Sequence, residues 1–97
     1  MDLAFNYLTG AFPTIAFPLS LQHLYVNSNK FVGTLPSTIG SFSSLNILDV
    51  SDNLFTGTLP NISTMISLRL LVVANNAFMG DLISVFSDSS FNNHLDT

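Results

Sequence analysis

The stretch LQHLYVNSNKFVGTLP, from Leu21 to Pro36, is repeated almost position for position by LNILDVSDNLFTGTLP, from Leu45 to Pro60. Both follow the pattern L-x-x-L-x-L-x-x-N-x-F-x-G-x-L-P, with valine at the sixth position. On this frame the whole sequence divides into four units, whose asparagines are Asn6, Asn29, Asn53 and Asn76. These asparagines are 23, 24 and 23 residues apart, so the chain is built of an internal repeat.

This period and this spacing resemble the leucine-rich repeat, whose units are about 20 to 29 residues long. The segments Gly33–Gly40 and Gly57–Pro60 resemble the plant-specific class of that repeat, which carries L-x-G-x-I-P-x-x-L-G. The resemblance extends from residue 1 to about residue 86. It implies a second short strand in each unit. It also implies a relation to the ectodomains of plant receptor-like kinases, receptor-like proteins or polygalacturonase-inhibiting proteins.

The alternation of apolar residues within each unit predicts a short strand with apolar side chains inward and polar ones outward. Neighbouring units stack these strands about 4.8 Å apart. The predicted fold is therefore an α/β-type solenoid dominated by short parallel β-strands. It is a curved, right-handed leucine-rich-repeat superhelix of about 3.5 repeats of 23–24 residues.

We expect one domain over residues 1–97, with a partial repeat at 1–20 and repeats at 21–44, 45–67 and 68–90. Residues 91–97 would be the start of a further repeat or a frayed tail. The sequence opens in mid-repeat at Met1 and loses the pattern after Asp81. These features favour a fragment of a longer array, or a short product derived from one, with neighbouring repeats as partners.

Most letters of the frame have structural explanations. The asparagines are expected to form a ladder in which each side-chain amide bonds backbone groups where the strand ends. The aromatic or leucine two positions later is expected to fill the interior, which applies to Leu8, Phe31, Phe55 and Phe78. The glycine that follows permits a backbone turn that is closed to other residues.

Composition excludes several classes of function. With a net charge of −4 and only Lys30 and Arg69 as basic residues, the chain lacks the basic patch that nucleic acid binding requires. The longest near-continuous apolar stretch, Met65 to Ala74, is shorter than the ~20 residues that span a bilayer. The N-terminus lacks the pattern of a secretory signal. We therefore expect no nucleic acid partner and no membrane segment in this sequence.

Neither catalysis nor a cofactor is expected. The sequence has no glutamate, no G-x-S-x-G and no phosphate-binding loop, although a longer parent protein could carry a kinase domain elsewhere. Asp49-x-Ser51-x-Asn53 lacks the glycine and glutamate of a calcium loop, and His23 and His94 have no third ligand spaced to help them. We therefore expect no catalytic residue, no cofactor and no metal.

Candidate binding residues are the outward positions of the strands, which would form the concave face of the solenoid. Tyr25 with His23, Ile47, Leu70 and Val72 would form an apolar stripe, and such patches often mark contacts. Packing against a neighbouring part of a parent protein would explain the stripe as well. The principal candidates are His23, Tyr25, Asn27, Ile47, Asp49, Ser51, Asp52, Leu70, Val72 and Asn75; Asp2, Ala4, Phe5, Gln22, Ser28, Asn46, Arg69 and Ala74 complete the face.

Asn61-Ile62-Ser63 is a glycosylation sequon just past Pro60, in the segment expected on the convex side. If the protein is secreted, this asparagine is a candidate glycan site.

The sequence therefore favours a non-catalytic recognition module. It resembles part of a plant receptor-like ectodomain that binds a protein, peptide, glycan or co-receptor on its concave face, extracellularly or at the cell surface. Two alternatives remain open. One is an inhibitor of a cell-wall hydrolase, resembling polygalacturonase-inhibiting proteins, and the other is a structural spacer within a longer solenoid.

Overall fold

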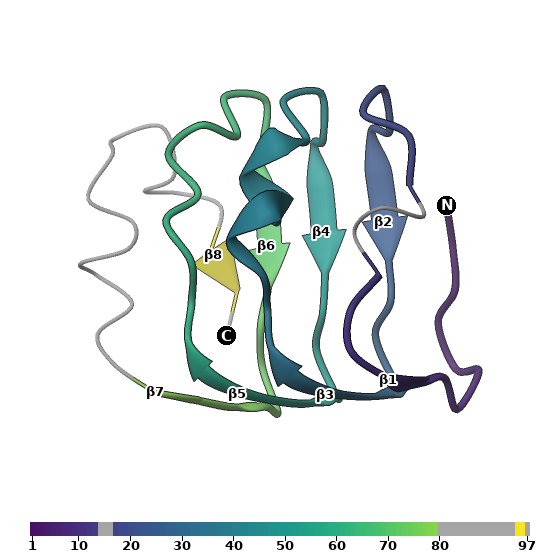
Figure 1. Cartoon of the computed structure of the whole chain (residues 1–97). Helices are drawn as coiled ribbons and strands as arrows, with labels where there is room; N and C mark the ends of the chain where they lie inside the picture. Colours follow the sequence, from purple (N-terminus) through teal and green to yellow (C-terminus); the bar gives the residue numbers. More distant parts are fainter. Residues whose placement is uncertain (14–16, 80–94, 97) are drawn as a thin grey trace.

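The computed structural model describes residues 1–13, 17–79 and 95–96. Its strands alternate along the chain between two parallel sheets, as Figure 1 shows. The main sheet has the order β2-β4-β6-β8, with strands His23–Tyr25, Ile47–Asp49, Leu70–Val72 and Leu95–Asp96. The second sheet has the order β1-β3-β5-β7, with strands Thr9–Gly10, Lys30–Thr34, Leu54–Thr58 and Ala77–Met79.

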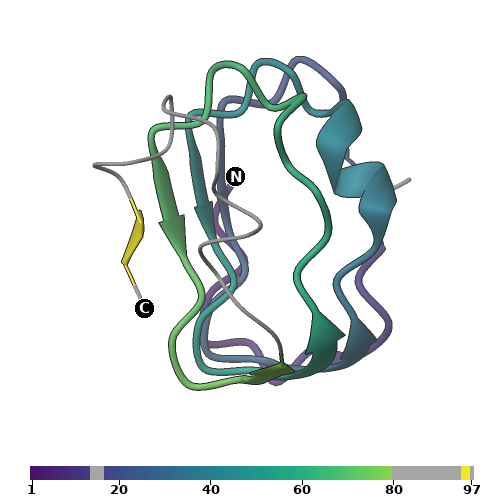
Figure 2. The ribbon, with the colours of Figure 1, turned by 90° about the vertical axis from the view of Figure 1, so that its left-hand side faces the viewer.

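Each of the units that begin at residues 21, 45 and 68 therefore contributes one strand to each sheet, and the first unit contributes β1 to the second sheet. Viewed along the array, the main sheet forms one side, the second sheet lies along the bottom, and the returning segments form the opposite side (Figure 2). One returning segment contains the 3-10 helix η2, Ser37–Ser41. The predicted parallel β-solenoid and its second strand are confirmed. Gly80, His94 and the segment between them lie outside the described residues, so the end of the fourth unit is not tested.

The main sheet stacks equivalent frame positions without offset. His23 pairs with Ile47, and Ile47 with Leu70. The short strand β8 continues this register, because Leu95 pairs with Leu71. At the other end, a single bridge joins Asp2 to Tyr25.

The second sheet is offset by two residues at every step, which places each phenylalanine beside the glycine of the preceding unit. The pairs are Gly10 with Phe31, Gly33 with Phe55, and Gly57 with Phe78. The three glycines have φ between 76° and 86°, a conformation that side chains disfavour. The F-x-G spacing thus has two structural roles. It provides the glycine for a turn within one unit, and it pairs the phenylalanine of each unit with the glycine of the preceding unit.

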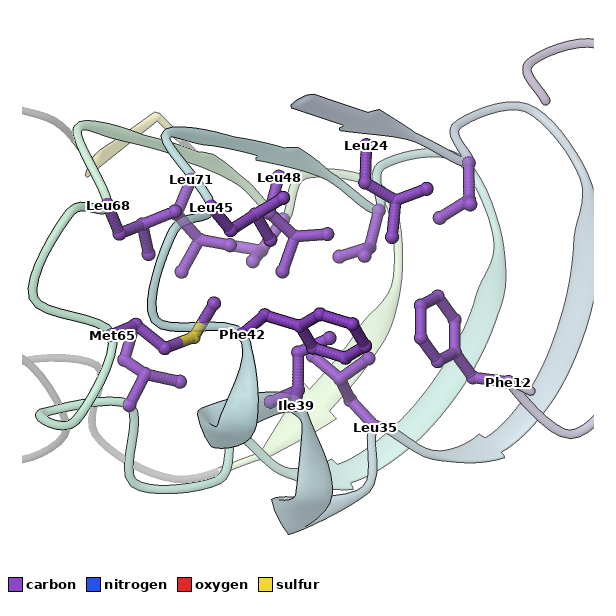
Figure 3. Packing of buried hydrophobic residues seen from close by; sticks show 14 of the residues in the cluster. Phe12, Leu24, Leu35, Ile39, Phe42, Leu45, Leu48, Met65, Leu68 and Leu71 are labelled. Atoms are coloured by element: carbon purple, nitrogen blue, oxygen red, sulfur yellow. The ribbon is translucent and has the colours of Figure 1, made fainter. Parts of the chain in front are cut away.

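The core fills the space between the two sheets and the returning segments (Figure 3). Leu24, Leu48 and Leu71 enter it from successive strands of the main sheet, and Ile39 and Met65 enter it from the opposite side. Burial of each such side chain stabilises the fold by roughly 1.5–3 kcal/mol. The core is therefore continuous from unit to unit.

A column of phenylalanine rings runs through this core. The rings of Phe31 and Phe55 stack with centroids 6.2 Å apart, and those of Phe55 and Phe78 with centroids 6.0 Å apart. Both pairs are inclined by 13°. The interior positions predicted for these three residues are correct, although Phe78 is only partly buried.

The interior position predicted for Leu8 is wrong, because 37% of this residue is exposed. Tyr7, just before it, adopts a left-handed φ of 56°, which the equivalent Lys30 does not. The chain direction therefore differs there. Phe12 fills the interior instead, with its ring centroid 6.0 Å from that of Phe31.

Asparagine side chains join consecutive units. The Nδ2 of Asn53 donates to the carbonyl oxygens of Val50 and Ser51 in its own unit, and to that of Val26 in the preceding unit. Its Oδ1 accepts the N–H of Phe31, also in the preceding unit, at 3.1 Å. Among the described residues no buried side-chain nitrogen or oxygen lacks a partner.

The same pattern recurs along the array. Asn29 donates to the carbonyl of Leu3, and Asn76 donates to that of Val50, each reaching back one unit. Asn6 lies at the end of the ladder and donates to carbonyls of its own unit only, those of Leu3 and Ala4.

Replacing Asn53 by alanine should lower the free energy of unfolding by about 3 kcal/mol or more, because several backbone groups lose their partner and each such group costs about 1–3 kcal/mol. Asn6→Ala is the matched control at the exposed end of the ladder, with an expected loss of about 1 kcal/mol or less. Urea denaturation followed by circular dichroism measures both. If Asn53→Ala unfolds at the same urea concentration as the wild type, the ladder does not stabilise the solenoid.

Gly57→Ala should be more destabilising than Gly33→Ala. Both substitutions place a side chain at positive φ, which costs about 1–2 kcal/mol. A Cβ at Gly57 would also lie 2.8 Å from the Cγ2 of Thr34, whereas a Cβ at Gly33 would meet nothing within 4 Å. Thr34→Ala removes that methyl group, so it should bring Gly57→Ala close to Gly33→Ala in a double-mutant cycle. Equal losses for the two single glycine variants would refute the contact.

Candidate functional site

The solvent-facing side of the main sheet carries the candidate binding residues, and we call it the concave face. Side chains alternate along a strand, so Leu24, Leu48 and Leu71 point into the core while their neighbours point outward. The pairing of the strands arranges these neighbours in rows across the sheet. Row one consists of His23, Ile47 and Leu70, and row two consists of Asp2, Tyr25, Asp49 and Val72.

The apolar stripe expected from the sequence is divided between these rows. Ile47 and Leu70 are adjacent in row one. In row two, Asp49 lies between Tyr25 and Val72, so these two residues are not direct neighbours. The stripe therefore spans both rows, and only the strand pairing, which the pattern within one unit does not reveal, shows which of its members meet directly.

A shallow, open depression of ≈ 580 Å³ lies over row one. Its lining combines apolar, amide and charged side chains, with Leu70 37% exposed. The lining residues are His23, Asn46, Ile47, Arg69 and Leu70. Asn46 and Arg69 were not among the principal candidates. Each precedes its strand by one residue, and the sequence does not indicate that both line the same depression.

Three carboxylates on the concave face are held by neutral donors. Asp49 Oδ1 accepts the N–H of Ser51 at 3.0 Å and its hydroxyl at 2.6 Å. Asp52 Oδ1 accepts the side-chain amide of Asn75 at 2.7 Å, and Asp2 Oδ1 accepts the N–H of Ala4 at 3.0 Å. These bonds fix the carboxylates in place without neutralising their charge.

Ser51 does not contribute to the surface as predicted. It is only 7% exposed, and its hydroxyl is bonded to Asp49. Its role is to orient that carboxylate rather than to meet a partner. Asn27, one unit earlier at the same frame position, is half-buried.

A third row consists of the residues just before each asparagine: Phe5, Ser28, Asp52 and Asn75. All four have φ between 54° and 60°. This conformation directs their N–H groups along the array, so that Ser28 donates to the carbonyl of Ser51 and Asp52 donates to that of Ala74. Aspartate and asparagine tolerate this region better than most residues.

The second sheet exposes apolar residues that sequence reasoning assigned no role. Val32 and Leu54 are paired across β3 and β5 and are 44% and 55% exposed. On the same flank, the Lys30 Nζ lies 5.5 Å from the centroid of the Tyr7 ring. This flank provides control positions outside the concave face.

Asn61 is exposed and belongs to the segment between β5 and β6. That segment returns on the side opposite the main sheet (Figure 2). The Oδ1 of Asn61 accepts the N–H of Ser63 at 3.0 Å, while Ile62 between them is buried. The sequon is thus anchored at its middle residue, with the asparagine and serine both exposed.

The described ranges contain no group of three or more histidine, cysteine, aspartate or glutamate residues arranged to hold a metal ion. Within the same part of the chain, no helix has the length and hydrophobicity needed to cross a bilayer.

Comparison with known proteins identifies the repeat. The family model for the Leucine Rich Repeat matches residues 20–42 and 44–64. Two relatives from Arabidopsis thaliana are Protein STRUBBELIG-RECEPTOR FAMILY 1, 38% identical over 48 residues, and Protein STRUBBELIG-RECEPTOR FAMILY 3, 33% identical over 52 residues. These matches cover 50% and 54% of this chain but only 6% and 7% of the relatives.

Solved structures from Arabidopsis thaliana share the fold. A chain of the BIR3–SERK2 complex matches 99% of this chain with a TM-score of 0.82 and 32% identity, over 55% of its own length. The leucine-rich-repeat ectodomain of the receptor kinase SOBIR1 matches 98% with a TM-score of 0.75 and 33% identity, over 56% of its length. The BIR2 ectodomain, 22% identical with a TM-score of 0.68, shows the fold alone.

The repeat match, the two stacked parallel sheets and these likenesses define a leucine-rich-repeat solenoid. The chain carries the leucine-rich repeat over the matched residues and is similar to the ectodomains of plant receptor-like proteins. Folds of this kind serve as protein-interaction modules.

Proposed function

We propose that this chain is a non-catalytic recognition module that binds another protein, or a peptide segment of one, through its concave face. The depression over row one carries the proposal, since it combines exposed apolar surface with polar groups able to fix a ligand's orientation. The likeness to one chain of a complex between two proteins adds support.

Rows one and two form the contact surface of this proposal, and Tyr25 in row two is half-buried. Aromatic residues are enriched at the centres of interfaces, because they bury a large area with few rotatable bonds. Asn27, Asp52 and Asn75 would lie at the polar rim. Binding of a glycan instead would use the same face.

One rival function also has an observation in its favour. The carboxylates of Asp49 and Asp52 would face a basic partner, as an inhibitor of a cell-wall hydrolase would require. An inhibition assay with a purified polygalacturonase separates the two functions. A spacer role within a longer solenoid predicts that the concave face binds nothing.

The similarity to receptor ectodomains also supports an extracellular or cell-surface location, reached through a longer parent protein. In that location Asn61 would carry a glycan. The glycan would project from the side opposite the main sheet and leave the concave face open.

Combining Tyr25→Ala with Val72→Asp should abolish partner binding while leaving the fold intact, because both side chains lie on the concave face and outside the core. Biolayer interferometry would test the 97-residue chain against a panel of plant leucine-rich-repeat ectodomains that includes BIR3 and SERK2. The wild type should bind at least one member. Circular dichroism verifies the fold of the variant.

Leu54→Ser is the matched control, since it removes an exposed apolar residue from the second sheet. It should bind like the wild type. If the wild type binds no ectodomain, or if the concave variant binds as well as the control, concave-face recognition of a protein is wrong.

Secretion of the chain from plant cells behind an added signal peptide tests the glycan. The product should lose mass on treatment with an endoglycosidase, and Asn61→Gln should show no such loss. A wild-type product of unmodified mass would exclude the site.

A further inference from the structure

We infer that the preferred ligand of the concave face is an extended, cationic peptide segment that crosses the strands. Its basic side chains recur every third residue and face row two, and its apolar side chains face row one. This inference rests on the proposed function and adds the chemical class of the ligand.

Row one determines where the apolar side chains bind. Ile47 and Leu70 are neighbours on adjacent strands, and together they form the apolar part of the depression. Asn46 and Arg69 line it as well. A hollow of this composition accommodates an aliphatic side chain and offers hydrogen bonds to the ligand backbone beside it.

Row two determines the charge of the ligand. Asp49 lies two residues beyond Ile47 on the same strand, so its carboxylate is about 6.6 Å further along the same face. Among the described residues no basic side chain pairs with Asp2, Asp49 or Asp52. Lys30 lies instead against Tyr7 on the flank of the second sheet. A ligand that supplies positive charge therefore meets uncompensated carboxylates, while an anionic one is repelled.

The spacing of row two determines the conformation of the ligand. Asp2 and Asp49 lie on either side of Tyr25 in the ladder, so these two residues are two steps, or about 10 Å, apart. A polyproline II chain rises about 3.1 Å per residue and repeats every three residues, so side chains three apart lie on one side about 9.3 Å apart. Two basic residues at that spacing reach both carboxylates.

Tyr25 contributes to the same geometry. This half-buried residue lies between Asp2 and Asp49 in the ladder, where an aromatic ring can pack against a proline or against the stem of a basic side chain. Proline-rich segments are commonly recognised by such aromatic surfaces, because their extended conformation is already formed before binding.

Fluorescence anisotropy with three labelled peptides tests the inference. The first contains three repeats of Lys-Pro-Leu, the second replaces each lysine by glutamate, and the third replaces each leucine by serine. The full 97-residue chain should bind the first peptide most tightly, and that binding should weaken as salt is raised, because partly exposed charges are screened. The glutamate peptide should not bind.

Asp49→Asn should weaken binding of the lysine peptide by roughly two- to fivefold, the range for a partly exposed ion pair, and should reduce its salt dependence. The amide oxygen of asparagine can still accept the bonds from Ser51, so the fold is kept. Leu70→Ser should weaken binding of the lysine–leucine peptide and not that of the lysine–serine peptide. Leu54→Ser, on the second sheet, should change neither.

Equal binding of the lysine and glutamate peptides, or unchanged affinity in Asp49→Asn, would overturn the inference. If no peptide binds but a plant ectodomain binds and is lost in the Tyr25→Ala, Val72→Asp variant, the cationic ligand is wrong and concave-face recognition stands. If neither peptide nor ectodomain binds, both proposals fail.

Discussion

Hydrogen bonds from the asparagine side chains to two units at once are the constraint on which this structure depends. Where each strand of the main sheet ends, the chain turns into the second sheet and leaves backbone groups without a strand partner. Asn53 bonds such groups in its own unit and in the preceding one. Every unit has such unpaired backbone groups, so every unit needs an asparagine at this position. The hydrogen bonds of these asparagines hold the strands of successive units in register.

This constraint divides the residues between structure and recognition. The leucines, valines and phenylalanines of the frame enter the core, and the asparagines and glycines shape the turns. The positions left free are the outward ones of a three-residue strand, so each unit offers only two or three side chains to a ligand. A binding surface of useful size therefore has to be assembled from several units, as the depression that spans His23, Ile47 and Leu70 illustrates.

The second strand of each unit was implied by the resemblance to the plant-specific class of leucine-rich repeat. The repeat pattern itself was sufficient to predict the solenoid and its inward residues, because these follow from periodicity within one unit. It could not predict what neighbours in space decide. Asp49 separates Tyr25 from Val72 through strand pairing, and Ser51 is buried through a bond to Asp49. Leu8 is displaced from the interior by a local change of backbone direction, and Phe12 takes its place. No spacing rule encodes these pairwise relations.

The unequal stacking of the two sheets has a consequence for larger assemblies of such units. Equivalent residues lie side by side in the main sheet, whereas the second sheet advances by two residues, about 6.6 Å, at each step. A stack that is level along one edge and sheared along another has to rotate about its long axis. In a long array the recognition surface would follow a helical path about the long axis. A rigid partner could then contact it over only a few units.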